Sequence, residues 1–203
     1  MDRKKIIFAT GNRGKLREAS EILGDGFELF TPANYGLTED IPETGETLEE
    51  NSFQKADYIF KNLGTDCFAD DTGLEVEALG GAPGVYTARY AGDSKDFNLN
   101  MDKVLAELEA LEAEDPATSR RARFRSVVTL ILDGEVRQFE GIMNGTIARR
   151  KSGRGGFGYD PIFIPDEYPG LTAADITEEQ KNEISHRGKA LRAMAGFLND
   201  CSL

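Results

Sequence analysis

Apolar residues follow two different spacings along the first third of the chain. Residues 5–9 form a short, largely apolar run typical of a buried strand, and apolar positions then recur at helical spacing over residues 16–23. Residues 27–30 predict a second strand. A longer helix is predicted over residues 47–63, where the apolar positions share one face, and Gly64 is suited to end it. The predicted order is strand, helix, strand, helix.

The pattern becomes less regular in the middle of the chain. Residues 67–69 predict a short strand, and residues 74–79 alternate apolar and acidic side chains as a half-exposed strand does. The glycine-rich segment 80–84 interrupts regular structure. Helical spacing returns over residues 99–111 and stops before Pro116.

A hairpin and a final helix complete the prediction. Two strands are predicted at residues 124–132 and 136–147, joined by Asp133 and Gly134, a pair frequent in two-residue hairpin turns. A last helix is expected after Ser185, which can cap it. Strand–helix units followed by a hairpin predict a mixed α/β fold.

Chain length and cysteine content indicate the size of the fold and the cellular environment of the protein. A chain of 203 residues can bury a core of ordinary size, and we expect a single domain over residues 1–203. The two cysteines lack the close spacing of a zinc site, which suits a reducing cytoplasm. The apolar run near the N-terminus is too short for a signal peptide or a membrane span. A cytoplasmic protein that avoids membranes is expected.

Charge narrows the choice of ligand. The formal net charge is −12, which argues against nucleic-acid binding because affinity for that polyanion comes largely from clustered Lys and Arg. The four arginines within residues 120–125 are expected to protect the start or edge of a strand. A small anionic ligand remains compatible, provided that it meets a local basic pocket, and a metal ion would help.

Two adjacent carboxylates, Asp70 and Asp71, follow the predicted strand at residues 67–69. Acidic side chains at a half-desolvated strand end need a cation, hydrogen bonds or solvent to compensate them. Successive strand side chains point to opposite faces, so only one of the two can enter a given pocket. The pattern fits a metal site, and it also fits a solvated turn.

The segment between the first strand and the first helix combines glycines with cations at a helix N-terminus. It reads Thr10, Gly11, Asn12, Arg13, Gly14 and Lys15. Free backbone N–H groups at such a place bind anions. The spacing is not that of a Walker P-loop, and a plain strand-to-helix turn is the alternative.

Two later segments could also bind a ligand. Around Phe157, Gly158, Tyr159 and Asp160, glycines permit close backbone approach and two aromatic rings could stack on a base, unless the rings belong to the core. Lys181, His186 and Arg187 lie near the start of the last helix and could pair with a phosphate or with purine carbonyl oxygens. A lone histidine at a helix start is more often structural.

Taken together, these motifs resemble those of one family, the inosine triphosphate pyrophosphatases, which act on noncanonical purine nucleotides. The resemblance runs in order from about residue 5 to about residue 195. The motifs that carry it are Thr10-Gly11-Asn12 with Lys15, Ala69-Asp70-Asp71-Thr72-Gly73, Gly80 to Tyr86 with Ala88-Arg89-Tyr90, Phe157-Gly158-Tyr159-Asp160-Pro161, and Ser185-His186-Arg187. Several motifs in register are more specific than any one of them.

The resemblance implies an activity and a fold. The activity is Mg²⁺-dependent hydrolysis of ITP, dITP and XTP to the monophosphate and pyrophosphate, which removes deaminated purines from the nucleotide pool. The implied fold is an elongated mixed sheet with flanking helices and two lobes around a central cleft. A homodimer is implied as well.

The resemblance also implies residue roles. Asp71 would be the catalytic carboxylate and a Mg²⁺ ligand with Glu43, although other acids between residues 39 and 50 are alternatives to Glu43. Substrate would be bound by the Thr10–Lys15 loop together with Lys55, Thr72, Phe157, Gly158, Tyr159, Asp160, Lys181, His186 and Arg187. Thr72 stands where many bacterial relatives have Ser, which keeps the hydroxyl group.

Two other functions remain open at this point. One is a pyrophosphatase of similar fold that prefers modified pyrimidines or methylated nucleotides, against which the Ser185-His186-Arg187 segment argues. The other is a nucleotide-binding regulator without turnover, against which the presence of Asp71 and Lys15 argues. A substrate panel with pyrophosphate detection separates all three.

Overall fold

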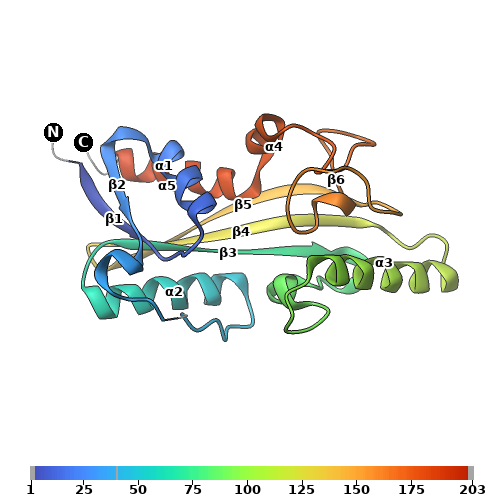
Figure 1. Cartoon of the computed structure of the whole chain (residues 1–203), viewed down its shortest axis with the longest axis horizontal. Coiled ribbons are helices and arrows are strands. Elements are labelled where there is room, and N and C mark those ends of the chain that lie inside the picture. The colour runs from blue at the N-terminus through green and yellow to red at the C-terminus, as the bar shows by residue number, and fades with distance from the viewer. Residues whose placement is uncertain (1–2, 40, 201–203) are drawn as a thin grey trace. The chain divides into compact units, whose positions relative to one another are not determined.

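The computed structural model describes residues 3–39 and 41–200, and these form a mixed sheet flanked by helices (Figure 1). The strands are β1 (Lys4–Phe8), β2 (Phe27–Phe30), β3 (Cys67–Val76), β4 (Arg121–Leu132), β5 (Glu135–Ile147) and β6 (Phe163–Pro165), in the spatial order β2-β1-β3-β4-β5-β6. The α-helices are α1 (Arg13–Leu23), α2 (Leu48–Leu63), α3 (Phe97–Glu114), α4 (Glu178–Ile184) and α5 (His186–Asp200). The predicted mixed α/β class is confirmed.

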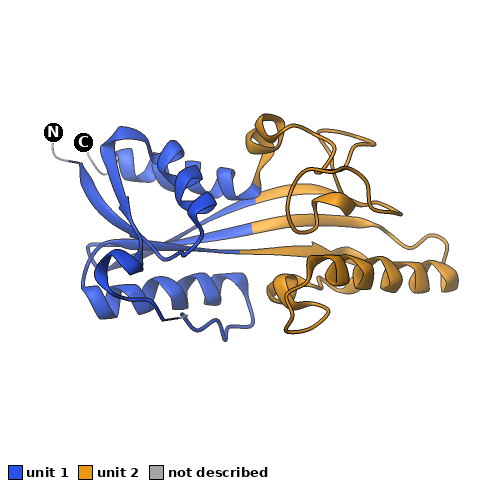
Figure 2. Ribbon diagram, viewed as in Figure 1, with its two compact units in different colours: residues 1–71, 126–141, 186–203 blue, residues 72–125, 142–185 orange. Residues whose placement is uncertain are grey.

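The chain divides into two compact units (Figure 2). Unit 1 comprises residues 1–71, 126–141 and 186–203, and unit 2 comprises residues 72–125 and 142–185. The boundary falls inside β3, between Asp71 and Thr72. The expectation of one domain with two lobes stays a prediction.

Unit 1 is a parallel β2-β1-β3 arrangement covered on both faces. β1 pairs in parallel with β2 and with β3, and Phe8 lies opposite Phe68. Since the connections between parallel strands need a crossover, α1 links β1 to β2 and α2 follows β2 and leads to β3. One core joins Phe8 and Phe68 to α1 and α5, and a second core joins Ile7 and Ala69 to α2. Helices α1 and α5 therefore cover one face, and α2 covers the other (Figure 1).

Capping residues explain where these helices start and stop, and of these only Gly64 was predicted from the sequence. Asn12 caps α1, and Thr47 caps α2 in a capping box with Glu50. Gly64 ends α2 in the left-handed conformation, with φ 61°. The helix predicted over residues 47–63 is therefore confirmed.

The prediction that a strand ends at Ala69 is wrong. β3 continues without a break from Cys67 to Val76, so Asp70 and Asp71 lie inside a strand and not in a turn. Turn-forming residue types suggested an interruption, but cations from other elements compensate the buried Asp70 and the partly buried Asp71, and the strand ladder continues. The strand predicted at residues 74–79 instead ends at Val76, and Glu77–Leu79 forms a 3₁₀ turn.

The β4–β5 hairpin is confirmed. Asp133 and Gly134 both adopt positive φ, 51° and 83°, as a tight two-residue turn requires. β4 starts at Arg121, three positions before the predicted start, because alternate residues such as Ala122 and Phe124 enter the core of unit 2. In the part of the chain that the structure describes, every helix is too short or too polar to cross a bilayer.

Candidate active site

Strand alternation sends Asp70 and Asp71 to opposite faces of the sheet. On β3, Phe68 joins the core under α1 and α5, and Ala69 joins the core under α2. Side chains two positions apart on a strand point to the same face. Asp70 therefore points to the same face as Phe68, and Asp71 points to the same face as Ala69. The sequence prediction that the two carboxylates point in opposite directions is confirmed by their different partners.

On the first face, Asp70 binds two cations. The Lys15 Nζ donates to both carboxylate oxygens, at 3.0 and 2.9 Å, and the Arg187 Nε donates to Oδ2 at 3.1 Å. Arg187 also donates from Nη1 to Glu18, at 3.3 Å. The Asp70 side chain is only 2% exposed. One buried carboxylate thus joins the first turn of α1 to the first turn of α5.

On the second face, Asp71 shares one cation with Glu43. The Lys55 Nζ, from the middle of α2, donates to Asp71 Oδ1 at 2.8 Å and to Glu43 Oε1 at 2.6 Å. Lys55 is nearly buried, whereas Glu43 is about two-fifths exposed, at 41%. Two carboxylates from distant parts of the sequence therefore converge on a single positive charge.

The two aspartates have opposite pKa shifts. Burial by itself would raise the pKa of the Asp70 carboxyl, but Lys15 and then Arg187 outweigh it and hold that pKa well below its usual range. Burial raises the pKa of Asp71, and Lys55 only partly opposes this effect. Asp70 therefore stays ionised, and Asp71 is the better proton acceptor of the two near neutral pH.

The loop before α1 is ordered by its own side chains. Asn12 Oδ1 accepts from the backbone N–H groups of Gly14 and Lys15, at 2.8 and 3.2 Å, and Thr10 Oγ1 accepts from the Asn12 N–H at 3.1 Å. Two of the N–H groups expected to bind an anion are thus already used by the cap. Arg13 and the glycines are exposed, so the loop is accessible to a ligand.

A second group of predicted residues lies in unit 2. Asp160 is buried, and its Oδ2 accepts from the Phe157 N–H at 2.6 Å and from the Lys181 ammonium. The Tyr159 ring is 1% exposed and its hydroxyl donates to the Thr87 carbonyl, whereas Phe157 is 69% exposed. Of the two aromatics considered for base stacking, only Phe157 presents its ring to solvent.

The predicted residues are therefore placed in two groups, each within one unit. Unit 1 holds the loop from Thr10 to Lys15 with Glu43, Lys55, Asp71, His186 and Arg187, and unit 2 holds Thr72, Phe157, Gly158, Tyr159, Asp160 and Lys181. Sequence reasoning gave no role to Glu18, and it assigned the catalytic and metal-binding roles to Asp71 and not to Asp70. The signal for Glu18 was its position three residues after Lys15, on the same helix face.

The acidic residues between positions 39 and 50 are sorted by their contacts. Glu43 accepts a hydrogen bond from Lys55, and Glu50 closes the capping box of α2. Asp40 lies outside the described residues.

Among the described residues, no three Asp, Glu, His or Cys side chains gather into a metal site of their own. Mg²⁺ needs only one or two carboxylates when substrate phosphates complete its shell, so Glu43 and Asp71 fit that role.

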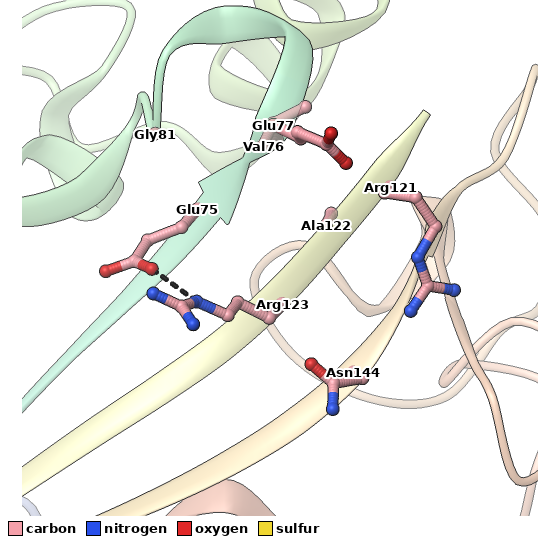
Figure 3. Close-up of a pocket in the computed structure, with 8 residues that line it drawn as sticks. All are labelled: Glu75, Val76, Glu77, Gly81, Arg121, Ala122, Arg123 and Asn144. Carbon is pink, nitrogen blue, oxygen red and sulfur yellow. Dashed lines mark hydrogen bonds and ion pairs between the residues drawn. The ribbon is translucent and has the colours of Figure 1, made fainter. Parts of the chain in front are cut away.

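A pocket of about 330 Å³ lies within unit 2, and none of these residues is among those that line it (Figure 3). It is lined on β3 and β4 by Glu75 and Arg123, which form an ion pair at 2.6 Å, and by Arg121, which binds Asp166. Both arginines already bind carboxylates. The pocket therefore lacks the excess positive charge that a phosphate group needs.

The connectivity of unit 1 explains why the candidate site residues lie near the loop after β1 and the aspartates of β3. Helix α1 leaves β1 on one face and α2 enters β3 from the other, and ligands of open α/β sheets bind beyond the carboxyl ends of strands where the connections separate in this way. Because Phe8, the last residue of β1, lies opposite Phe68, the loop after β1 and the two aspartates of β3 both lie beyond the carboxyl end of β1. Fold and site together define an α/β protein equipped to hold a polyanion with the help of cations.

Comparison with known proteins identifies the family. The sequence model of the Ham1 family matches residues 6–197. The dITP/XTP pyrophosphatase of Flavobacterium psychrophilum is 45% identical over 196 residues, covering 97% of this chain and 100% of the relative, and that of Bacillus subtilis is 45% identical over 197 residues, covering 96% and 97%. A solved structure of the Staphylococcus aureus Ham1 protein superposes with a TM-score of 0.88 at 38% identity, covering 97% of this chain and 99% of the other. This chain belongs to the Ham1 family.

Proposed function

We propose that this protein hydrolyses ITP, dITP and XTP to the nucleoside monophosphate and pyrophosphate. The observation that carries the proposal is the pair of carboxylate–cation clusters on β3, in a chain similar along its whole length to proteins named dITP/XTP pyrophosphatase. The product would be a purine monophosphate that can no longer enter nucleic acid directly.

The chemistry requires a positioned water, charge neutralisation and a stabilised leaving group. Asp71 would accept a proton from the water that attacks the α-phosphorus. The bond between the α-phosphorus and the bridging oxygen breaks, and pyrophosphate leaves with the bond electrons. Lys15 and Lys55 would stabilise its charge, and the proton leaves Asp71 for solvent.

Glu43 and Asp71 would hold Mg²⁺ in the working enzyme. When bound, Mg²⁺ would supply neutralisation of phosphate charge. The support for this assignment is the convergence of the two carboxylates on Lys55, a place where positive charge is already favourable.

Base selection would come from residues of the second group together with His186 and Arg187 of the first. Phe157 offers an exposed ring for stacking. His186, Arg187 and Lys181 would bind the 6-keto purine, and Thr72, Gly158 and Asp160 would line the sugar and base. A 6-amino group would leave buried donors or acceptors without partners, which is the strongest form of discrimination.

The test is a panel of triphosphates assayed with Mg²⁺. ITP, dITP and XTP should release IMP, dIMP and XMP together with pyrophosphate in equal amounts. Appearance of IDP and orthophosphate would contradict the proposed bond. ATP turnover equal to that of ITP would contradict the specificity, and preference for modified pyrimidine or methylated nucleotides would favour the related pyrophosphatase class.

A homodimer in the cytoplasm is part of the proposal. Its support is the family resemblance, and a subunit mass of 22.3 kDa makes the test simple. Sedimentation equilibrium should give twice that mass. A monomer at micromolar concentration would contradict the dimer and leave the proposed reaction unaffected.

A further inference from the structure

We propose that Asp70 is a positioning residue that holds the Lys15 ammonium and the Arg187 guanidinium in fixed places for substrate. This inference rests on the proposed function, because that function assigns the triphosphate to Lys15 and the base to Arg187. The new element is the role of the buried Asp70. Without contacting substrate itself, Asp70 would fix the cation that binds the triphosphate and the cation that binds the base.

The contacts of Asp70 use its entire carboxylate. Lys15 contacts both oxygens, at 3.0 and 2.9 Å, and Arg187 contacts Oδ2, at 3.1 Å. The carboxylate is buried, so it cannot exchange these partners for water at low cost. Removing its charge would leave two cations to repel each other.

Both cations retain donors for a ligand. An ammonium group has three N–H donors, and Lys15 uses two of them on Asp70. A guanidinium has five donors, and Arg187 uses one on Asp70 and one on Glu18. Donors fixed before substrate arrives need no reorganisation during binding or reaction, which makes them more effective.

The location of Asp70 explains why one residue can serve both cations. Lys15 lies in the first turn of α1 and Arg187 in the first turn of α5, and the two helices pack together on the face of β3 to which Asp70 points. Lys15 and Arg187 are 172 positions apart in sequence, as their numbers show. Asp70 is the carboxylate that contacts both.

The experiment measures ligand affinity by calorimetry in Asp70→Asn, with inorganic tripolyphosphate as the probe for Lys15 and IMP as the probe for Arg187. Both affinities should fall by about tenfold or more, because a small misplacement of a binding group has large effects. The matched control is Asp66→Asn. Asp66 also binds a lysine within unit 1, Lys4 at 3.3 Å, and its loss should leave both affinities within about twofold.

A double-variant cycle separates positioning from general destabilisation. In a Lys15→Met background, Asp70→Asn should change tripolyphosphate affinity by less than about twofold, since Asp70 acts there through Lys15, while IMP affinity should still fall. Equal losses of tripolyphosphate affinity in both backgrounds would overturn the proposal. So would wild-type affinity for both probes in folded Asp70→Asn.

If Asp70→Asn does not fold, Asp70→Glu decides the matter because it keeps the charge and moves it by one methylene group. Positioning predicts a stable protein with weakened binding of both probes, and wild-type affinity would overturn it. Failure of the proposed function is distinguishable: wild-type protein would then release no pyrophosphate from ITP and bind no IMP. The tripolyphosphate measurements would still decide whether Asp70 positions Lys15.

Discussion

Asp70 and Asp71 are neighbours in sequence but belong to different environments. Asp70 is enclosed by Lys15 and Arg187 and stays ionised, whereas burial raises the pKa of Asp71. The difference comes from strand geometry, which gives each residue the cations of the helix on its own face. As residue types, Asp70 and Asp71 are identical, so only their positions in the fold distinguish their roles.

Replacing Asp71 by Asn should reduce kcat for ITP by at least about a hundredfold, because the amide cannot accept the proton of the attacking water. Pyrophosphate release measures the effect, and circular dichroism checks the fold. The control is Asp57→Asn, which removes an aspartate that pairs with Lys61 on the surface of α2 and should retain activity. Near-normal turnover in Asp71→Asn would remove Asp71 from the proposed role.

The Cys67 thiol should resist alkylation in the native protein. It is fully buried, its Sγ donates to the Ala56 carbonyl at 3.3 Å, and burial raises its pKa to about 12. Only the thiolate reacts, so iodoacetamide at pH 8 should leave Cys67 unmodified by mass spectrometry until urea unfolds the chain. A Cys201→Ser variant restricts the readout to Cys67, and rapid native labelling would contradict the burial.

At the level of elements, the start of α5 depends on its close approach to β5. A Cβ added at Gly141 would overlap the His186 carbonyl oxygen and the Ala190 N–H. Only a residue without a side chain allows this contact. The position of Arg187, and with it the arrangement around Asp70, therefore depends on a glycine in another element.

Gly141→Ala should lower the free energy of unfolding by about 2 kcal/mol or more, as overpacking against backbone does, and should also weaken ITP turnover. Gly196→Ala is the matched control, because a Cβ there meets nothing within 4 Å. That helical substitution should be neutral or stabilising by up to about 1 kcal/mol. Urea titrations measure both, and equal stability of the two variants would contradict the assigned contact.

The elements themselves were largely readable from sequence. Helical spacing located α1, α2 and α5, and the Asp133-Gly134 turn located the hairpin. The continuity of β3 was missed because turn-forming residues interrupt its pattern. Local preference for a turn was overridden by tertiary ion pairs, which no local rule can represent.

At the scale of the whole molecule, the acidic charge of −12 must coexist with an anionic substrate. Lys15, Lys55 and Arg187 lie close to carboxylates, so the site needs further positive charge to hold a triphosphate. We therefore expect the proposed reaction to require a divalent metal ion.

Chelation with EDTA should therefore abolish pyrophosphate release, and excess Mg²⁺ should restore it. Glu43→Gln should raise the Mg²⁺ concentration needed for half-maximal activity by about tenfold, because it removes one proposed ligand. Glu46→Gln serves as the control, since Glu46 belongs to the same acidic segment but its backbone N–H donates to Glu50, whereas Lys55 contacts Glu43. Full activity in EDTA would contradict the metal assignment.

The sequence by itself determined the mixed α/β class, the main helices and the hairpin, and it supplied the candidate residues of the proposed site. Those properties depend on periodicity, turn chemistry and motif content, which are local. The tertiary structure alone decided that Asp70 meets Lys15 and Arg187, that Asp71 and Glu43 share Lys55, and that Tyr159 is buried while Phe157 is exposed. These outcomes depend on which helix covers which face of β3 and on contacts between residues far apart in the chain.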